Sequence, residues 1–214
     1  MTDRPVDAAA FIEAHLPVVA VPGIPEVRLH RASPASGLNR LAARDAAGFG
    51  SPYWAYPWAG GLALARHLLD HPQIAAGRRV LDLGAGSGLV AIAAAKAGAR
   101  EVLAAEIDPY ARAALALNAR LNGVEIAVTA EDLLSGEPPA VDLVLAGDLF
   151  YAPDLAARVL AFLERAARGG AAVLIGDPWR AALPLARLRL LARYETAEVG
   201  RAAPVPSGVF TLAP

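Results

Sequence analysis

The chain has no cysteine among its 214 residues, and this absence excludes a disulfide framework and any metal site built on thiolates. It also lacks an unbroken run of about 18 strongly apolar residues, the length that a membrane-spanning helix requires. Its first residues, Met1-Thr-Asp-Arg-Pro, do not follow the basic and then apolar pattern of a secretion signal. These absences together predict a cytoplasmic protein with no membrane partner.

An excess of charge of either sign is also missing. The formal net charge is −1, whereas proteins that bind nucleic acid carry a basic patch or stripe, so we predict no nucleic-acid partner. His67 and His71 lie four residues apart near the end of a predicted helix over 60–70. No glutamate stands between them in the zinc-protease order and a proline follows at once, so we predict no metal site and assign both histidines to the helix end.

What the sequence does contain is an apolar stretch that leads into three alternate glycines. Val80-Leu-Asp-Leu is followed by Gly84, Gly86 and Gly88, and then by the apolar residues of a predicted helix over 88–97. Glycine permits a sharp turn with positive φ and lets a ligand approach the backbone closely. The start of the helix presents unpaired N–H groups, which suit a carboxylate. The pattern therefore predicts a site for a nucleotide cofactor.

The spacing of these glycines narrows the choice of cofactor. A dinucleotide fingerprint, G-x-G-x-x-G, needs a third glycine at the position of Leu89. Asp82, at the carboxyl end of a predicted strand over 79–83, offers a negative partner for an ammonium group. The alternative interpretation is an ordinary strand-turn-helix corner, in which the glycines only permit close packing.

A second acidic residue follows about 20 residues after the glycine turn. Residues 101–106 form a predicted apolar strand, and Glu106 stands at its end, where a carboxylate can accept hydrogen bonds from both hydroxyls of a ribose. Asp108 directly precedes Pro109, a residue favoured at the first helical position. We therefore predict that Asp108 is the N-cap of a helix over 109–121 rather than a ligand.

Strands and helices alternate along most of the chain, which predicts an α/β fold with a doubly wound, mostly parallel sheet. After a further predicted helix over 181–191, two closing strands are expected to run antiparallel. The first 50 residues form an N-terminal extension with a helix over 8–16, a proline-rich stretch over 17–25 and a possible strand over 26–30, and residues 51–214 form the main domain. The expected strands of that domain are 79–83, 101–106, 125–129, 141–146, 171–176, 193–199 and 208–212, and its other helices are 60–70, 88–97, 109–121 and 153–167.

Three further segments place polar or aromatic residues at strand ends or beside glycines. Residues 51–61 contain Trp54 and Trp58 next to a glycine pair. Such aromatic side chains can form the floor of a site for a flat cofactor or line a narrow tunnel. Residues 141–151 form a strand whose end delivers Asp148 and Tyr151 to the rim of the sheet, where ligands bind in α/β folds. Residues 173–180 read Val-Leu-Ile-Gly-Asp-Pro-Trp-Arg, another strand-end carboxylate with a rigid turn.

The run D-x-G-x-G-x-G resembles the first motif of class I S-adenosylmethionine-dependent methyltransferases. Four further segments carry a more specific resemblance: P-Y-W-A-x-x-W-x-G-G, the acid-I-D-P turn, G-D-L-F-Y and I-G-D-P-x-R. Together with the glycine motif, they make the chain similar to the lysine methyltransferases of the electron transfer flavoprotein β subunit. The resemblance covers roughly residues 50–214. The chain resembles, more distantly, the methyltransferases that modify ribosomal protein L11.

The resemblance implies a seven-stranded Rossmann-like sheet, S-adenosylmethionine as cofactor and a protein substrate, the electron transfer flavoprotein β subunit. It implies an adenine contact from Asp132, whereas the neighbouring Glu131 is as well explained as a solvated residue. Glu106 departs from the family pattern, in which Asp is usual. The implied cofactor residues are Trp58, Asp82, Gly84, Gly86, Gly88, Glu106, Asp132 and Gly147, and the implied acceptor residues are Asp148 and Tyr151.

Several alternatives remain beside these assignments. Trp54, Tyr56 and Trp58 could instead form the core of a buried hairpin, and Asp148 could be the N-cap of a short turn before Pro153. The same fold also serves methyltransferases of L11 or of small molecules, and a module that keeps the cofactor loop without catalysis. The sequence makes no prediction of oligomeric state.

Methylation of lysine requires its neutral amine. Deprotonating a free lysine at pH 7 costs about 4.6 kcal/mol, and a nearby sulfonium and a poorly hydrated tunnel both lower the lysine pKa. A carboxylate acts in the opposite direction. We therefore expect Asp148 to capture and align the lysine while the proton leaves through water, with most of the rate gain coming from positioning.

Overall fold

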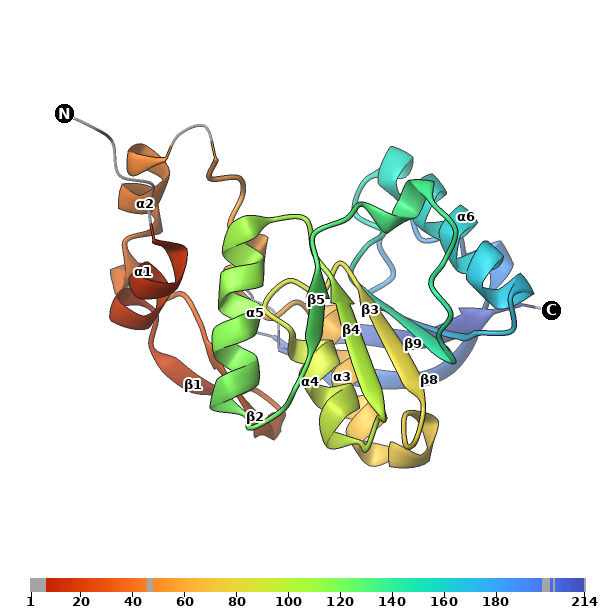
Figure 1. The fold of residues 1–214 in the computed structure, drawn as a ribbon. Coiled ribbons are helices and arrows are strands. Elements are labelled where there is room, and N and C mark those ends of the chain that lie inside the picture. The colour runs from red at the N-terminus through yellow and green to blue at the C-terminus, as the bar shows by residue number, and fades with distance from the viewer. Residues whose placement is uncertain (1–6, 46–47, 198–200, 202, 214) are drawn as a thin grey trace.

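A seven-stranded sheet forms the centre of the molecule, with strand order β5-β4-β3-β6-β7-β9-β8 (Figure 1). The computed structural model describes residues 7–45, 48–197, 201 and 203–213. The strands are β3 (Arg79–Leu83), β4 (Glu101–Ala105), β5 (Ala127–Thr129), β6 (Leu143–Gly147), β7 (Ala172–Asp177), β8 (Leu188–Thr196) and β9 (Val205–Leu212). The main helices are α3 (Ala59–Asp70), α4 (Leu89–Lys96), α5 (Pro109–Leu121) and α6 (Pro153–Arg168).

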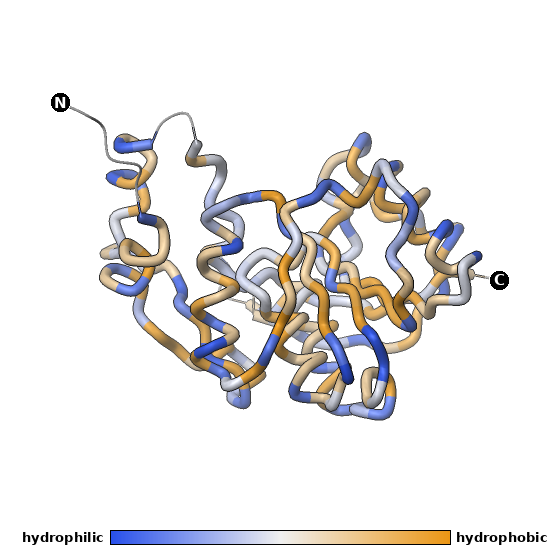
Figure 2. Tube along the Cα trace, viewed as in Figure 1, coloured by the Kyte–Doolittle hydropathy of each residue, from blue (hydrophilic) through white to orange (hydrophobic). Residues whose placement is uncertain are grey.

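Helices cover both faces of this sheet, as the sequence predicted. Side chains alternate along each strand, so Val80 joins one core cluster with α3, α4 and α5, while its neighbour Leu81 joins another with α6. Figure 2 shows hydrophobic residues along the central strands and hydrophilic ones at their amino ends, where β3 begins with Arg79 and β4 with Glu101. Burial of both faces explains why the interiors of these strands are mostly apolar.

The two closing strands run antiparallel to their neighbours, as expected, but their bounds differ from the predicted ones. β9 lies between β7 and β8 and runs antiparallel to both. Within the expected strand over 193–199, residues 193–196 belong to β8, and residues 198–199 lie outside the described residues.

The helix expected over 181–191 is wrong. The chain forms a short 3₁₀ turn at Leu185–Arg187 and enters β8 at Leu188. Pro184 disfavours a helical conformation at the residue before it, and leucine alternates with arginine over the next positions, as in a half-buried strand. The pairing of Leu188 with Leu212 then fixes β8 on the sheet.

The described part of the N-terminal extension packs against the main domain. It contains α1 (Ala8–His15), a hairpin of β1 (Val18–Val21) and β2 (Ile24–His30), and α2 (Leu38–Arg44). The sequence predicted the first helix and β2 but neither β1 nor α2. Phe11 and Ile12 of α1 share a buried cluster with Tyr110 of α5. Asn118 of α5 accepts a hydrogen bond from the backbone of His30 at 2.8 Å.

No helix in the described part of the chain has both the length and the apolar character needed to cross a bilayer.

Candidate active site

The glycine turn after β3 has the backbone conformation that its sequence predicts. Gly84, Gly86 and Gly88 have φ of +64°, +54° and +88°, values in the left-handed region. Gly84 and Gly86 line a cleft at the carboxyl ends of the strands, whereas Gly88 lies outside the cleft lining and is the N-cap of α4. A Cβ on Gly88 would approach Leu115 to 2.9 Å, so this glycine permits close packing of the turn on α5.

Asp82 lies directly beneath this turn. Its side chain accepts a hydrogen bond of 2.9 Å from the backbone N–H of Ala91 in the first turn of α4, and the residue is 1% exposed. Burial, opposed by that hydrogen bond, raises the pKa of Asp82 to about 8. Asp82 lines the cleft, and its carboxyl group, once ionised, can pair with a positive charge there.

Glu106, at the end of β4, is joined to the glycine turn. Its two carboxylate oxygens accept hydrogen bonds from the backbone N–H of Gly86 at 2.8 Å and of Asp108 at 2.9 Å. Asp108 instead caps α5 by accepting from the N–H groups of Tyr110 and Ala111, which confirms the predicted cap. Both acids line the cleft, but the Asp108 side chain is engaged in beginning a helix whereas the Glu106 side chain binds the glycine turn.

Asp132 lies at the far side of the cleft. One of its oxygens accepts from Leu134 N–H at 3.1 Å and the other pairs with Arg158 at 2.6 Å. The bond to Arg158 lowers the pKa of this carboxyl below its ordinary value. Glu131 also lines the cleft.

Three aromatic side chains form one wall of the cleft mouth. The rings of Tyr53 and Trp58 have centroids 5.9 Å apart, and those of Tyr53 and Tyr151 lie 6.1 Å apart. Trp58 fixes this arrangement by donating its indole N–H to the carbonyl of Tyr53 at 2.8 Å. Trp54 differs, because it is buried and stacks on Tyr110. Trp54 therefore belongs to the core, as the alternative interpretation predicted, although it also borders the cleft, and Trp58 lines the cleft.

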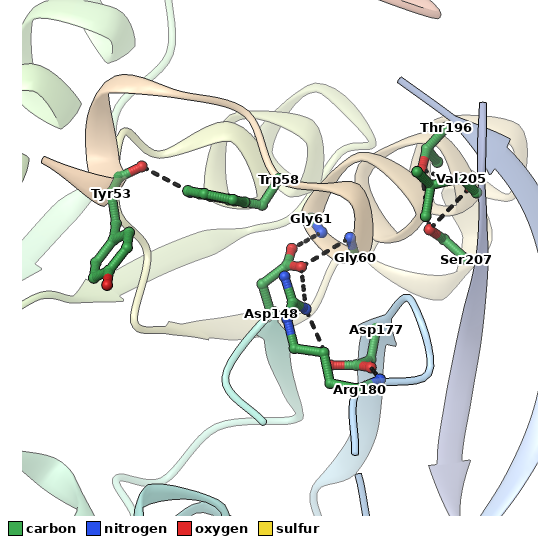
Figure 3. A network of polar contacts seen from close by, with 10 residues as sticks. All are labelled: Tyr53, Trp58, Gly60, Gly61, Asp148, Asp177, Arg180, Thr196, Val205 and Ser207. Atoms are coloured by element: carbon green, nitrogen blue, oxygen red, sulfur yellow. Dashed lines mark hydrogen bonds and ion pairs between the residues drawn. The ribbon is translucent and has the colours of Figure 1, made fainter. Parts of the chain in front are cut away.

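Asp148 is held by helix α3 and by Arg180 (Figure 3). Its carboxylate accepts hydrogen bonds from the N–H groups of Gly60 and Gly61 and pairs with the Arg180 guanidinium at 2.5 Å. It does not cap α6, whose N-cap is Ala152. The φ of Asp148 is +59°, a strained value for a residue other than glycine and one that is common at functional sites.

Glycines allow α3 to reach Asp148. A Cβ on Gly60 would come within 2.3 Å of the carbonyl oxygen of Gly176, and one on Gly147 within 3.1 Å of Gly61 Cα. The glycine pair 60–61 therefore lets the start of α3 press directly on the ends of β6 and β7. This contact turns two unpaired N–H groups of α3 toward a carboxylate, which is the partner that a helix N-terminus favours.

The cleft has a volume of about 600 Å³ and brings most of the predicted residues together. It lies within the size range of small-molecule sites. Gly88 is the predicted site residue that stays outside its lining. The predicted residues that line it are Trp58, Asp82, Gly84, Gly86, Glu106, Asp132, Gly147, Asp148 and Tyr151.

Sequence reasoning gave no role to Tyr53 and Arg180, which also line the cleft. Arg180 closes the G-D-P-x-R motif, so the signal was present, but its partner Asp148 lies 32 residues away in the chain. His67 and His71 lie elsewhere, and Nδ1 of His67 is 2.9 Å from the Tyr194 hydroxyl. Within the described ranges, no group of three or more potential ligands is placed to hold a metal ion.

Comparisons with known proteins show which family the chain resembles. The profile of the family described as ribosomal protein L11 methyltransferase (PrmA) matches residues 63–171. The electron transfer flavoprotein β subunit lysine methyltransferase of Xenopus laevis is 42% identical over 195 residues, which cover 88% of this chain and 79% of that protein. The mouse protein of the same name is 45% identical over 134 residues, 62% of this chain and 52% of that protein.

A solved methyltransferase structure has a fold similar to that of this chain. The ribosomal protein L11 methylase of Lactobacillus delbrueckii subsp. bulgaricus has a TM-score of 0.50 at 25% identity, covering 71% of this chain and 77% of that one. The sheet order, the glycine turn and the acid at the end of β4 are those of a class I methyltransferase. Within that class, the chain belongs to the electron transfer flavoprotein β subunit lysine methyltransferase family.

Proposed function

We propose that this protein transfers methyl groups from S-adenosylmethionine to lysine side chains of the electron transfer flavoprotein β subunit. One observation carries the proposal. A single cleft is lined both by the glycine turn, whose Gly86 donates its N–H to Glu106, and by Asp148 and the aromatic Tyr151. The first pair suits a nucleotide with a ribose and an amino acid, and the second suits a cationic acceptor with an alkyl chain.

The residues of the cleft fit the cofactor. Glu106 would bind the ribose hydroxyls, the turn at Gly84 and Gly86 would contact the amino-acid end, and Asp82 would face its ammonium group. Asp132 would lie toward the adenine. Gly84 and Gly86 have positive φ and carry no Cβ, so no side-chain atom shields their backbone from the cofactor. When bound, the cofactor supplies an electrophilic methyl group, whose bond to sulfur breaks as a bond to the lysine nitrogen forms.

The acceptor end of the cleft would orient the lysine. Tyr151 is 59% exposed and Tyr53 is 58% exposed, so their rings are free to pack against the alkyl chain of an incoming lysine. Asp148 would bind the ammonium group and align it, and the proton would leave to water before transfer. Packing of the lysine against these rings would displace water from this end, which lowers the pKa of the lysine.

The substrate assignment rests on the relatives. The Xenopus and mouse proteins are named as lysine methyltransferases of the electron transfer flavoprotein β subunit. The fold alone does not select an acceptor, because one class I core serves many substrates. A cytoplasmic place of action stays a prediction from the N-terminal sequence.

Labelled cofactor tests the proposal directly. The purified protein and S-adenosylmethionine with a radioactive methyl group should label lysines of the flavoprotein β subunit, identified by mass spectrometry. Asp148→Ala should lower turnover by about 100-fold or more while cofactor affinity changes little, because positioning contributes such factors. The matched control is Asp142→Asn, which alters an Arg79-paired carboxyl outside the cleft.

Each outcome has a definite meaning. Label on protein L11 or on a small amine, with none on the β subunit, would contradict the substrate assignment. Cofactor binding in calorimetry without methylated product in any lysate would contradict catalysis. Wild-type turnover of Asp148→Ala would remove that residue from the acceptor site.

A further inference from the structure

Behind the acceptor end of the cleft lies a cluster of two carboxylates and one guanidinium. Asp148, Asp177 and Arg180 form it, from the end of β6, the end of β7 and the turn after β7. Asp177 is completely buried, and the side chains of Asp148 and Arg180 are 11% and 20% exposed. Charges that are so poorly hydrated interact strongly.

The guanidinium is shared between the two acids. One nitrogen of Arg180, Nη1, lies 2.5 Å from Oδ1 of Asp148 and 3.2 Å from Oδ2 of Asp177. The other oxygen of Asp177 accepts the backbone N–H of Arg180 at 2.7 Å. Asp177 therefore holds both the side chain and the backbone of this arginine (Figure 3).

The charge of the cluster follows from this sharing. Two ionised carboxylates and one guanidinium leave a net charge of −1, which equals the charge needed to balance one cation. If Arg180 had Asp148 as its only partner, the pair would be neutral. Of the two acids, Asp148 borders the cleft whereas Asp177 does not. The negative charge that remains is thus available on the side where an acceptor enters.

We propose that Asp177 is a positioning residue that balances the charge of Arg180, so that the cluster keeps a net negative charge for the ammonium group of the acceptor lysine. This inference rests on the proposed function, because it takes Asp148 as the acceptor contact. Arg180 then fixes the orientation of Asp148, and the second carboxylate, Asp177, prevents the guanidinium from neutralising the cluster. The class of substrate that such a cluster selects is a cation with one positive charge.

A purely structural role for Asp177 gives different expectations. The hydrogen bond from Asp177 to the N–H of Arg180 also shapes the turn. Asp177→Asn preserves an oxygen for that bond, removes the charge and turns an NH₂ group toward Nη1 of Arg180, so the side-chain contact is lost as well. Arg180→Gln removes the guanidinium and leaves two negative charges. The double variant restores the net charge of −1, although it loses every ion pair of the cluster.

Steady-state kinetics of these variants test the inference. Asp177→Asn should raise the KM for the acceptor protein about tenfold, within the range of couplings measured in ion-pair networks, while the cofactor Kd stays unchanged. Adding Arg180→Gln should recover part of that loss. A structural role would instead make the double variant worse than Asp177→Asn alone. Asp142→Asn serves again as the matched control, and thermal melting verifies that each variant folds.

A second measurement does not depend on activity. Titration of the Asp148 carboxyl by ¹³C NMR should show a lower pKa in Asp177→Asn than in the wild type, because a neighbouring negative charge is gone. An unchanged Asp148 pKa, or an unchanged acceptor KM, would overturn the inference. If Asp148→Ala abolishes turnover while Asp177→Asn keeps the wild-type KM, the inference fails and the proposed function stands. If Asp148→Ala has wild-type turnover, the acceptor role itself fails.

Discussion

Replacing Glu106 by glutamine probes the cofactor end of the cleft. Both carboxylate oxygens of Glu106 accept backbone N–H groups, one from Gly86 at 2.8 Å and one from Asp108 at 2.9 Å. Glutamine has the same shape but offers only one oxygen, and it turns an NH₂ group toward one of these donors. The substitution also removes the negative charge to which the hydroxyls of a ribose would donate hydrogen bonds.

The size of the effect follows from the number of bonds lost. A hydrogen bond to a charged group contributes about 1.5–3 kcal/mol, and glutamine forfeits one such bond to the diol. The affinity for S-adenosylmethionine should therefore fall by about 10- to 150-fold, since each 1.4 kcal/mol is a factor of about ten. Glu106→Asp, which keeps the charge on a shorter side chain, should fall between the wild type and glutamine.

Isothermal titration calorimetry with S-adenosylmethionine and with S-adenosylhomocysteine measures this loss. Glu101→Gln is the matched control, because Glu101 is an exposed residue at the opposite end of the same strand. The Glu101→Gln variant should bind S-adenosylmethionine with the same affinity as the wild type. If folded Glu106→Gln binds the cofactor within about twofold of the wild type, a ribose contact of Glu106 is refuted.

Two further predictions concern stability. Because burial raises the pKa of Asp82 to about 8, the folded state favours its protonated form, so this group should lower the free energy of unfolding as pH rises from about 4 to about 8. Asp82→Asn should flatten that dependence, and urea unfolding at pH 5 and pH 8 measures it; an equal slope in both proteins would contradict the assignment. Phe162 in α6 is 0% exposed, and Phe162→Ala should lower the free energy of unfolding by about 3–5 kcal/mol. The exposed Leu185→Ala should change it by less than about 0.5 kcal/mol, and equal losses at both positions would contradict the core assignment.

The parts of the site that the sequence predicted well depend on short stretches of chain. Three alternate glycines and the following helix require only local backbone conformation, and the structure has positive φ at all three. The same holds for Asp108, whose place before a proline marks a helix start. Parallel strands also bring their carboxyl ends to one edge of the sheet. That rule places Glu106 and Asp148 on one cleft without further information.

The helix expected over 181–191 failed because its apolar content fits two structures. Leucine-rich segments suit a helix by propensity, but the alternation around Leu188 suits a strand. Pairing of β8 with the edge of β9 decided between them, and this pairing is a long-range contact. Tertiary context overrides propensity in such segments.

The sequence by itself determined the α/β class, the cofactor turn and the acids at the strand ends, because these follow from apolar periodicity and from neighbours close in the chain. Only the tertiary structure decided what surrounds Asp148. Its partners Gly60 and Arg180 lie 88 and 32 residues away, and they meet because glycine lets α3 press against the strand ends. Strand order and helix contact set the charge around Asp148, and neither is encoded within any short segment.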